Sequence, residues 1–286
     1  MSPSRKRPLV TFLQTEFKVS ERRACRVLNQ NRRTQNYKAK RPDIDRPLVE
    51  RMLVLAEKHP RYGYRRIAAL LRHEGWEVNI KRIHRLWKLE GKQVSNRPKK
   101  HRKAGEGKNA CHVNKSLFPN DVWTYDFLFD QTEDGRTFKV LALIDEFTRR
   151  CLVLEVQRRL NHEDVWKVLQ KAFLQYGRPK RIRSDNGSEF VAEHLKHCFE
   201  TFGIETLHIA PGSPWQNGYA ESFISRFKDE CLNRELFGHL LEAQVVIEEH
   251  RKTYNSVRPH SSLKYQTPEQ FYRTYINKLA VSKTVV

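Results

Sequence analysis

Long hydrophobic runs are absent from this sequence of 286 residues, and its mean hydropathy is only −0.74. A helix that crosses a membrane needs about 20 consecutive apolar residues, and no segment approaches that. The opening segment MSPSRKRPLVTFLQTEFKVS is interrupted by charges throughout, which is unlike a secretion signal. These absences predict a cytoplasmic protein with no membrane partner.

Cysteine is scarce, with five residues that are widely spaced and form no CxxC pair. An odd, scattered set excludes a disulfide framework and a zinc ribbon, and it fits a reducing compartment. A local group of zinc-ligand types is formed by His194, His197 and Cys198. Because no fourth ligand lies close by, an ordinary helix is the favoured interpretation there.

Acidic residues are scarce in the first part of the chain only. Residues 1–115 contain 31 Lys and Arg against 10 Asp and Glu, whereas residues 116–286 contain 23 of each. The whole net charge of +21 therefore lies in the first 40% of the sequence. A solvated basic surface is the simple explanation, but so large a local excess favours a module that binds a polyanion.

Three short amphipathic patterns within this basic part predict a helix-turn-helix. They lie at residues 43–59, 64–74 and 79–90. The third pattern has a basic face, formed by Lys81, Arg82, Arg85 and Lys88. Such a face suits DNA phosphates and base edges, although an ordinary three-helix domain with a solvated basic face remains the alternative.

Beyond residue 115 the hydrophobic period changes from that of helices to that of strands. Strand-like segments occur at 122–130, 137–147, 151–156, 180–184 and 204–210. Helical patterns separate the later ones, which gives the order β-β-β-α-β-α-β-α. A meander of three strands followed by alternation predicts an α/β domain with a mixed sheet.

Three carboxylates stand out in this second part. Asp126 interrupts a strand rich in aromatic residues, and Asp185 ends the fourth strand. Glu221 lies in the first turn of a helix, with 35 residues between it and Asp185. A charge within a buried strand is costly unless it is paired or binds a metal. Three oxygen donors with open positions suit one or two Mg²⁺ ions, and two such ions assist phosphoryl transfer.

Each of these residues also has a structural explanation when taken alone. Asp185 belongs to an Asp-Asn-Gly turn, and Glu221 is a favourable acid at a helix N-terminus. Four other acidic residues compete with Asp126 for the first ligand position, namely Asp121, Asp130, Asp145 and Glu146. Among them Asp130 shares the strand face of Asp126, and Asp145 suits a supporting position beside the site.

These motifs resemble a known family. WTYDFLF, IRSDNGSEF and SPWQNGYAESFISRFKDE are similar to the three blocks of the integrase-type D,D(35)E core. They most resemble OrfB-type transposases, which are encoded by the second reading frame of bacterial insertion sequences. HPRYGYRRIAALLRHEGWEVNIKRIHRLWKLEG and YNSVRPHSSLKYQTPEQF are similar to that family's helix-turn-helix and tail, and the likeness spans about residues 43–272.

The resemblance implies a ribonuclease H-like core in which Asp126, Asp185 and Glu221 hold Mg²⁺, with Mn²⁺ as a substitute. It also draws attention to Lys228, which lies on the helix face of Glu221 and suits a DNA phosphate. A basic residue that the family carries one turn after the Glu is replaced here by Ser225. Two further candidates beside the site are Asn186 and Trp215.

The expected domain organisation follows from these patterns together. It comprises a basic segment with one short helix (1–41), a helix-turn-helix (42–91), a basic linker (92–113), the catalytic core (114–240) and a helical tail (241–286). The retroviral zinc module of two His and two Cys is missing from the N-terminal part, which favours the bacterial branch.

The predicted function is metal-dependent DNA cleavage followed by attack of the freed 3′-hydroxyl on a second phosphodiester. The resemblance implies double-stranded DNA as partner, a homo-multimer that pairs two element ends, and fusion to an upstream reading-frame product. Two alternatives remain at this stage. One is a DNA-binding regulator with an inert core, and the other is a nuclease that cuts without joining.

Overall fold

The computed structural model describes residues 1–37, 41–92, 115–184, 189–208 and 217–284. The chain divides into two compact units, Met1–Val54 and Leu55–Val286. The boundary falls within one helix, α4 (Arg41–Lys58), and each unit is described by itself.

The first unit contains more helix than the sequence predicted. Its elements are α1 (Pro3–Phe17), α2 (Glu21–Val27) and α3 (Arg32–Gln35). Ser20 caps α2, because its hydroxyl accepts a hydrogen bond from the Arg23 amide. The prediction of a single helix over residues 1–41 is therefore wrong. Val10 of α1 packs on Ala24 and Cys25, so α1 forms through packing with α2 rather than through a strong amphipathic pattern of its own.

The helix-turn-helix region is completed by two further helices, α5 (Tyr64–His73) and α6 (Ile80–Leu89). The Asn79 side chain caps α6 by accepting a hydrogen bond from the Lys81 amide. Ile67 and Leu71 of α5 and Ile83 of α6 are fully buried, which leaves the polar positions of α6 outside. The helical pattern read from the sequence is confirmed here.

A mixed sheet of five strands forms the centre of the second unit. The strands are β1 (Val122–Gln131), β2 (Thr137–Asp145), β3 (Cys151–Gln157), β4 (Arg181–Ser184) and β5 (Glu205–His208). Their spatial order is β3-β2-β1-β4-β5, and the first three pair antiparallel. Because β4 and β5 run parallel to β1, the sheet has the ribonuclease H-like topology that the sequence predicted.

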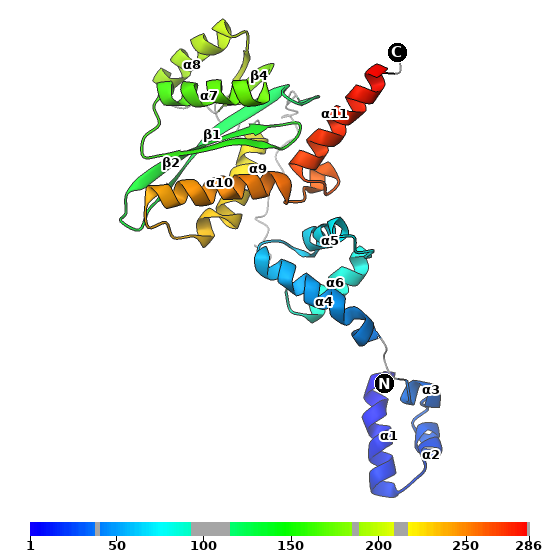
Figure 1. The fold of residues 1–286 in the computed structure, drawn as a ribbon. Helices are drawn as coiled ribbons and strands as arrows, with labels where there is room; N and C mark the ends of the chain where they lie inside the picture. Colours follow the sequence, from blue (N-terminus) through cyan, green and yellow to red (C-terminus); the bar gives the residue numbers. More distant parts are fainter. Residues whose placement is uncertain (38–40, 93–114, 185–188, 209–216, 285–286) are drawn as a thin grey trace, which may run out of the picture. The chain divides into compact units, whose positions relative to one another are not determined.

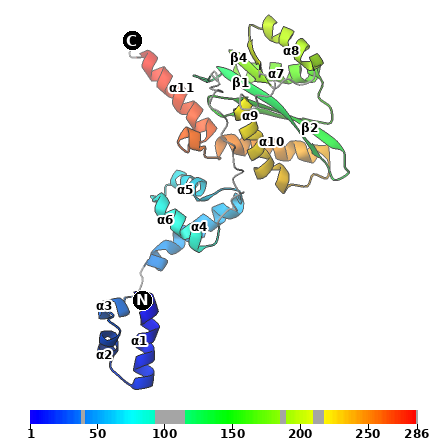
Figure 2. The ribbon, with the colours of Figure 1, turned by 180° about the vertical axis from the view of Figure 1, so that it is seen from behind.

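Helices cover both faces of this sheet (Figures 1 and 2). On one face α7 (His162–Tyr176) and α8 (Glu189–Thr201) pack against Trp123 and Tyr125 of β1. On the other, α9 (Gly218–Glu230) and α10 (Leu240–Ser256) pack against Leu128. Alternation along β1 thus sends odd-numbered side chains to one layer and even-numbered ones to the other.

A short helix, η2 (Leu232–Arg234), follows α9. After α10 the chain continues through a second short helix, η3 (Ser261–Leu263), to α11 (Pro268–Thr284). The buried Arg258 guanidinium donates two hydrogen bonds to Glu230, at 2.6 and 2.7 Å. This ion pair fixes the segment after α10 to the end of α9. Since a buried charge without its partner is costly, the two segments are expected to fold together.

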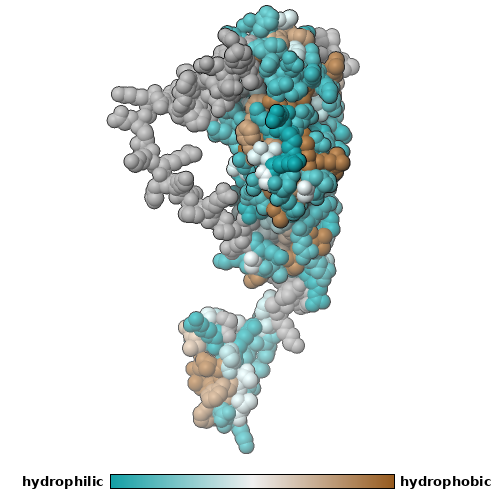
Figure 3. Space-filling model, turned by 90° about the vertical axis from the view of Figure 1, so that its left-hand side faces the viewer, coloured by the Kyte–Doolittle hydropathy of each residue, from teal (hydrophilic) through white to brown (hydrophobic). Residues whose placement is uncertain are grey.

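Hydrophilic side chains dominate the face drawn in Figure 3, and the apolar areas between them are small. None of the described helices is long and apolar enough to cross a membrane.

Candidate active site

Strand β1 carries the first candidate ligand and sets the position of the helix that carries another. Thr124, Asp126 and Leu128 alternate onto the face that α9 covers. The Thr124 hydroxyl lies 2.6 Å from Oδ1 of Asn217, the residue that precedes α9. Both side chains are buried, so this hydrogen bond fixes the start of α9 beside β1.

Glu221 lies at about the level of Asp126 along this interface. It follows Asn217 by four residues, or about 6 Å along a helix, and Asp126 follows Thr124 by two residues, or about 7 Å along a strand. The helix and the strand run in the same direction, because the far end of α9 meets the far end of β1. By these spacings the two residues lie at a similar level, and the proximity of their carboxylates stays a prediction.

The two carboxylates differ in their surroundings. Asp126 is half-buried, and its Oδ1 accepts a hydrogen bond of 2.7 Å from the Phe127 amide. Glu221 is exposed, on the flank of α9 that lies away from the buried Phe223 and Phe227. An exposed carboxylate beside a half-buried one leaves oxygen atoms accessible to a cation, which fits the hard oxygen ligands that Mg²⁺ takes.

Asp185, the third predicted ligand, lies outside the described residues, as do Asn186 and Trp215. The strand that leads to it is described: β4 pairs with β1, and Ser184 lies opposite Tyr125. The last described residue of β4 is thus paired with the residue that directly precedes Asp126. Within the described part of the chain, no three His, Cys, Asp or Glu residues form a group that could hold a metal.

Asp130 shares the strand face of Asp126 but lies near the opposite end of α9. Its carboxylate accepts a hydrogen bond from the Gln131 amide at 2.9 Å. It is close enough to Cys231 to help raise the pKa of that thiol, which burial chiefly raises to about 12. Cys231 follows Glu221 by ten residues, or about 15 Å along the helix, so Asp126 fits the site better than Asp130.

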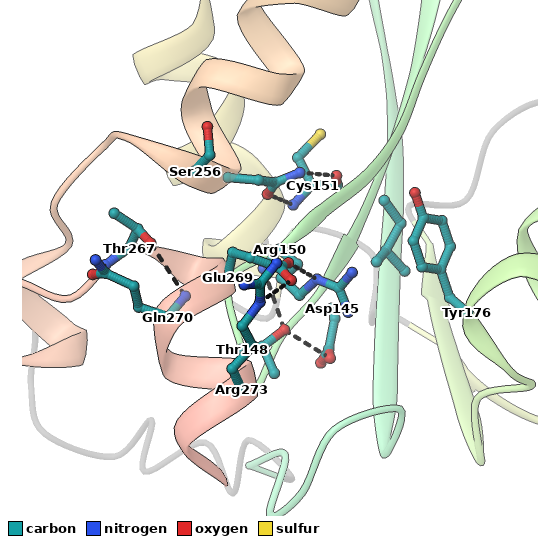
Figure 4. Close-up of polar contacts among 12 residues, drawn as sticks. Asp145, Thr148, Arg150, Cys151, Tyr176, Ser256, Thr267, Glu269, Gln270 and Arg273 are labelled. Carbon is teal, nitrogen blue, oxygen red and sulfur yellow. Dashed lines mark hydrogen bonds and ion pairs between the residues drawn. The ribbon is translucent and has the colours of Figure 1, made fainter. Parts of the chain in front are cut away.

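Asp145 organises the turn between β2 and β3 (Figure 4). It accepts hydrogen bonds from the Phe147 amide at 2.9 Å and from the Thr148 hydroxyl at 2.8 Å. This turn also places Arg150 beside Glu269 of α11, with 3.3 Å between the charged atoms. Burial raises the pKa of Asp145 above its usual value, against these hydrogen bonds.

Two further acidic competitors are engaged in ion pairs with β4. Asp121 accepts a hydrogen bond of 2.7 Å from Arg181 and another from the Leu117 amide. Glu146 is fully buried 3.3 Å from Arg183, the β4 residue that pairs with Thr124. Burial raises the pKa of Glu146 to about 7, even though the Arg183 charge opposes that shift. Both acids therefore help to hold β4, the strand that precedes residue 185, in place.

Lys228 lies on α9 as the sequence predicted. It is exposed, and seven residues place it about 20° around the helix axis from Glu221. Ser225 is exposed as well, between them. This flank of α9 thus presents one acid and one base to solvent.

The basic face of α6 is present in the structure. Lys81, Arg85 and Lys88 are exposed and Arg82 is half-buried, while Leu86 and Trp87 face inward. Arg72, which lies near this face in the sequence, has a structural contact instead, because its guanidinium donates to the Val78 carbonyl at 3.1 Å.

The suspected zinc ligands lie on α8, as an ordinary helix requires. Cys198 Sγ is 3.8 Å from His194 Nδ1, and the His194 ring lies 4.7 Å from that of His162. His197 is exposed.

Sequence reasoning missed a group of residues on the opposite flank of α9. Arg149, from the turn after β2, stacks on Tyr219 with 3.8 Å between its guanidinium carbon and the ring centre. His260, from the tail, lies 3.2 Å from Arg258. The only signal was the motif YNSVRPHSSLKYQTPEQF, which gave a resemblance but no chemical role.

Three family models match this chain. Two models described as "Integrase core domain" match residues 118–214 and 202–268, and one described as "HTH-like domain" matches residues 43–101. Among solved structures, a human T-cell leukaemia virus integrase core in complex with magnesium has a TM-score of 0.39 at 17% identity. That alignment covers 55% of this chain and 97% of the viral one.

The curated relatives belong to bacterial insertion elements. A 39.2 kDa protein of insertion element IS476 from Xanthomonas euvesicatoria is 37% identical, over 96% of this chain and 79% of its own. A 31.7 kDa protein of IS407 from Burkholderia multivorans is 36% identical, over 92% and 94%. The transposase of IS904 from Lactococcus lactis is 28% identical, over 78% and 92%.

The fold and the matched models define a protein with an integrase core preceded by an HTH-like region. More narrowly, the chain belongs to the OrfB-type transposases of bacterial insertion sequences. The family resemblance read from the sequence is confirmed, and such proteins bind DNA.

Proposed function

We propose that this transposase cleaves DNA at the ends of its insertion element and joins the freed 3′-hydroxyl to a second phosphodiester. The observation that supports the proposal is the buried Thr124–Asn217 hydrogen bond, from which helix and strand spacings put Asp126 and Glu221 at about one level of the β1–α9 interface. The Thr124–Asn217 hydrogen bond maintains that placement. β4 ends at Ser184, which pairs with Tyr125, the residue before Asp126.

Asp126, Asp185 and Glu221 are the residues that would hold the metal. The metal would be Mg²⁺, with Mn²⁺ as a substitute, bound as one or two ions. When bound, the metal would activate the attacking oxygen and neutralise charge on the phosphate. The chain's own contribution is to orient these carboxylates. Thr124 and Asn217 fix the start of α9, and the β1–β4 pairing fixes the strand end that precedes Asp185.

The remaining parts are assigned by their charge and position. The basic face of α6 would bind the DNA of the element end, and Lys228 would contact a phosphate near the carboxylates. The domain boundaries read from the sequence give the corresponding division into DNA binding (42–91), linker (92–113), catalysis (114–240) and tail (241–286). Pairing of two ends would require a homo-multimer, and the upstream reading-frame product would add end recognition.

The test uses the purified chain with a labelled duplex that carries the element end, in Mg²⁺, Mn²⁺ or Ca²⁺. Cleaved and joined strands are then separated by denaturing electrophoresis. Both products are expected with Mg²⁺ or Mn²⁺. Cleavage without joined strands under all conditions would indicate a nuclease. Specific binding with neither product, in the presence of the upstream protein as well, would indicate a regulator with an inert core.

A further inference from the structure

A cavity of about 530 Å³ lies against α9, and its lining is strongly basic. Its walls come from the turn after β2, the first half of α9 and the tail segment after α10. None of the described lining residues is acidic, whereas the cations include Lys115, Arg149, Arg226 and Arg258. A cavity of this size holds a group the size of a nucleotide, and its charge selects an anion.

Three of these cations have no acidic partner among the residues that the structure describes. Arg258 is neutralised by Glu230, but Lys115, Arg149 and Arg226 form no ion pair with a described carboxylate. The Nη1 atom of Arg149 is buried and has no hydrogen-bond partner among the described residues. A buried donor without a partner costs about 1–3 kcal/mol, so this guanidinium is suited to an acceptor from outside the chain.

The backbone at Arg149 adds a second, independent observation. Its φ is +63°, in the left-handed region that disfavours a residue with a Cβ by about 1–2 kcal/mol. Glycine or asparagine would occupy this turn position at lower cost. Local strain of this kind is typical of residues whose side chain has a role, and Tyr219 fixes the direction of the guanidinium by stacking.

His260 reports the positive potential inside the cavity. Burial and, after it, the positive charges of the surrounding arginines, including Arg258, Arg149 and Arg226, together lower the pKa of His260 to about 2. The imidazole is therefore neutral, and its Nε2, 3.2 Å from Arg258, accepts a hydrogen bond from that guanidinium. This leaves Nδ1–H as a donor.

We propose that this cavity, with Arg149 and Arg226 as its anion-binding groups, holds a phosphodiester of the DNA strand that reaches the carboxylates. The proposal rests on the proposed function and adds a subsite to it. Arg226 follows Glu221 by five residues, which separates them by about 140° around the helix and 7.5 Å along it. A strand that crosses α9, about 10 Å wide, thus places the bound phosphate a few nucleotides from the scissile one.

The test replaces single phosphates of the labelled element-end duplex by uncharged methylphosphonates, one position at a time. Binding to the full-length protein is measured by fluorescence anisotropy in Ca²⁺. For the native protein, an uncharged group at one or two positions within a few nucleotides of the cleavage point is expected to weaken binding about 10- to 100-fold. In Arg149→Gln/Arg226→Gln the unmodified duplex should bind that much more weakly, and the methylphosphonates at those positions should have no further effect.

Two controls separate charge and folding from the subsite. Lys171→Gln removes one exposed cation from α7, which covers the opposite face of the sheet, and should retain the native methylphosphonate profile. Arg226→Gln alone changes an exposed residue, so its thermal midpoint should be native while the same positions lose part of their effect. Inorganic phosphate should compete only weakly, because the cavity takes a phosphate within a strand.

A double variant with the native methylphosphonate profile would overturn the proposal. The proposal would also be overturned if the double variant kept its methylphosphonate profile but no longer bound inorganic phosphate, as followed by ³¹P NMR. The cavity would then serve a free anion. Neither result touches the proposed function, which is judged by whether the native protein cleaves and joins in Mg²⁺. Conversely, an inactive native protein with the expected profile would leave the subsite in place.

Discussion

The basic face of α6 and the carboxylate flank of α9 differ in what they require of the chain. The first belongs to residues 1–115, which carry the entire net charge of +21, and consists of exposed cations on one helix. The second belongs to a part of the chain with no net charge, and it unites residues from a strand and a helix about 90 positions apart. Binding surfaces of the first kind tolerate shifts of several ångströms, whereas catalytic carboxylates do not.

The comparison teaches where each kind of surface is vulnerable. Long-range attraction to DNA depends on charge number and falls with salt. Chemistry depends on fixed positions, so it depends on buried contacts such as Thr124–Asn217 and Arg258–Glu230. Substitutions on the two surfaces should consequently separate binding from reaction.

The largest effect is expected at Asp126. Asp126→Asn should lower cleavage by at least about three orders of magnitude, because several kcal/mol of charge stabilisation is lost, while DNA affinity stays within about twofold. Asp185→Asn and Glu221→Gln should behave alike. Product formation and anisotropy are measured on the same preparations.

Asp130→Asn is the matched control, since it removes the same charge from the same strand face, near Cys231. It should retain nearly full activity. If Asp130→Asn were inactive and Asp126→Asn active, the first ligand would be Asp130. Glu221 would then lie at the level of Asp130, rather than of Asp126, along β1.

Lys228→Ala is expected to have the next largest effect. Loss of one charged hydrogen bond to a phosphate costs about 1.5–3 kcal/mol, which is about 10- to 100-fold in the joining rate. The Mg²⁺ concentration for half-maximal rate should not change, because a cation is not a ligand. A shifted Mg²⁺ requirement would show that Lys228 orients the carboxylates, and an unchanged joining rate would show that it is a surface residue.

The sequence predicted most of the second unit because its signals are local. Strand alternation and the order of elements can be read within short windows, and both are confirmed. The capping box that Asn161 forms at the start of α7 is local as well. α1 was missed because its pattern is weak and its one buried residue, Val10, gains its partners from α2.

The candidate site was only partly accessible to the same reasoning. Asp126 and Glu221 are distinguished by type and spacing, but nothing local shows that Asp130 lies towards the other end of α9. The basic cavity was inaccessible, because Arg149, Tyr219 and His260 come from segments 41 to 111 residues apart. Which cations are engaged in contacts within the chain is also visible only in the fold. Arg72 belongs to the basic part of the sequence, yet its guanidinium donates a hydrogen bond to the Val78 carbonyl.

The packing beneath α9 should respond to acid. His250 of α10 contacts the Phe227 ring, and burial lowers the pKa of His250 to about 4. Since the folded state resists protonation, stability is complete above about pH 6.5 and falls as the pH approaches 4. Between pH 7 and pH 5 the native protein should lose about 2 kcal/mol that His250→Gln does not lose.

Urea unfolding at the two pH values measures this difference. His73→Gln, at an exposed position of α5, is the control and should show the native pH dependence. Equal losses in native protein and His250→Gln would mean that His250 is solvated, and that other groups account for the acid sensitivity.

The smallest effect is expected on the basic face of α6. Lys81→Gln/Lys88→Gln removes two exposed cations from a helix whose buried side is unchanged, so folding should be native. Affinity for the element-end duplex should fall about tenfold at moderate salt. The slope of log K against log salt should decrease by about 1.8, since each lost phosphate contact contributes about 0.9. Cleavage at saturating protein should be unchanged, because the carboxylates are untouched.

Lys167→Gln/Lys171→Gln on α7 provides the matched loss of two exposed charges and should leave affinity and slope nearly native. If both pairs lowered the slope equally, the attraction would come from total charge rather than from α6, and the contrast between the two surfaces would fail at its binding end.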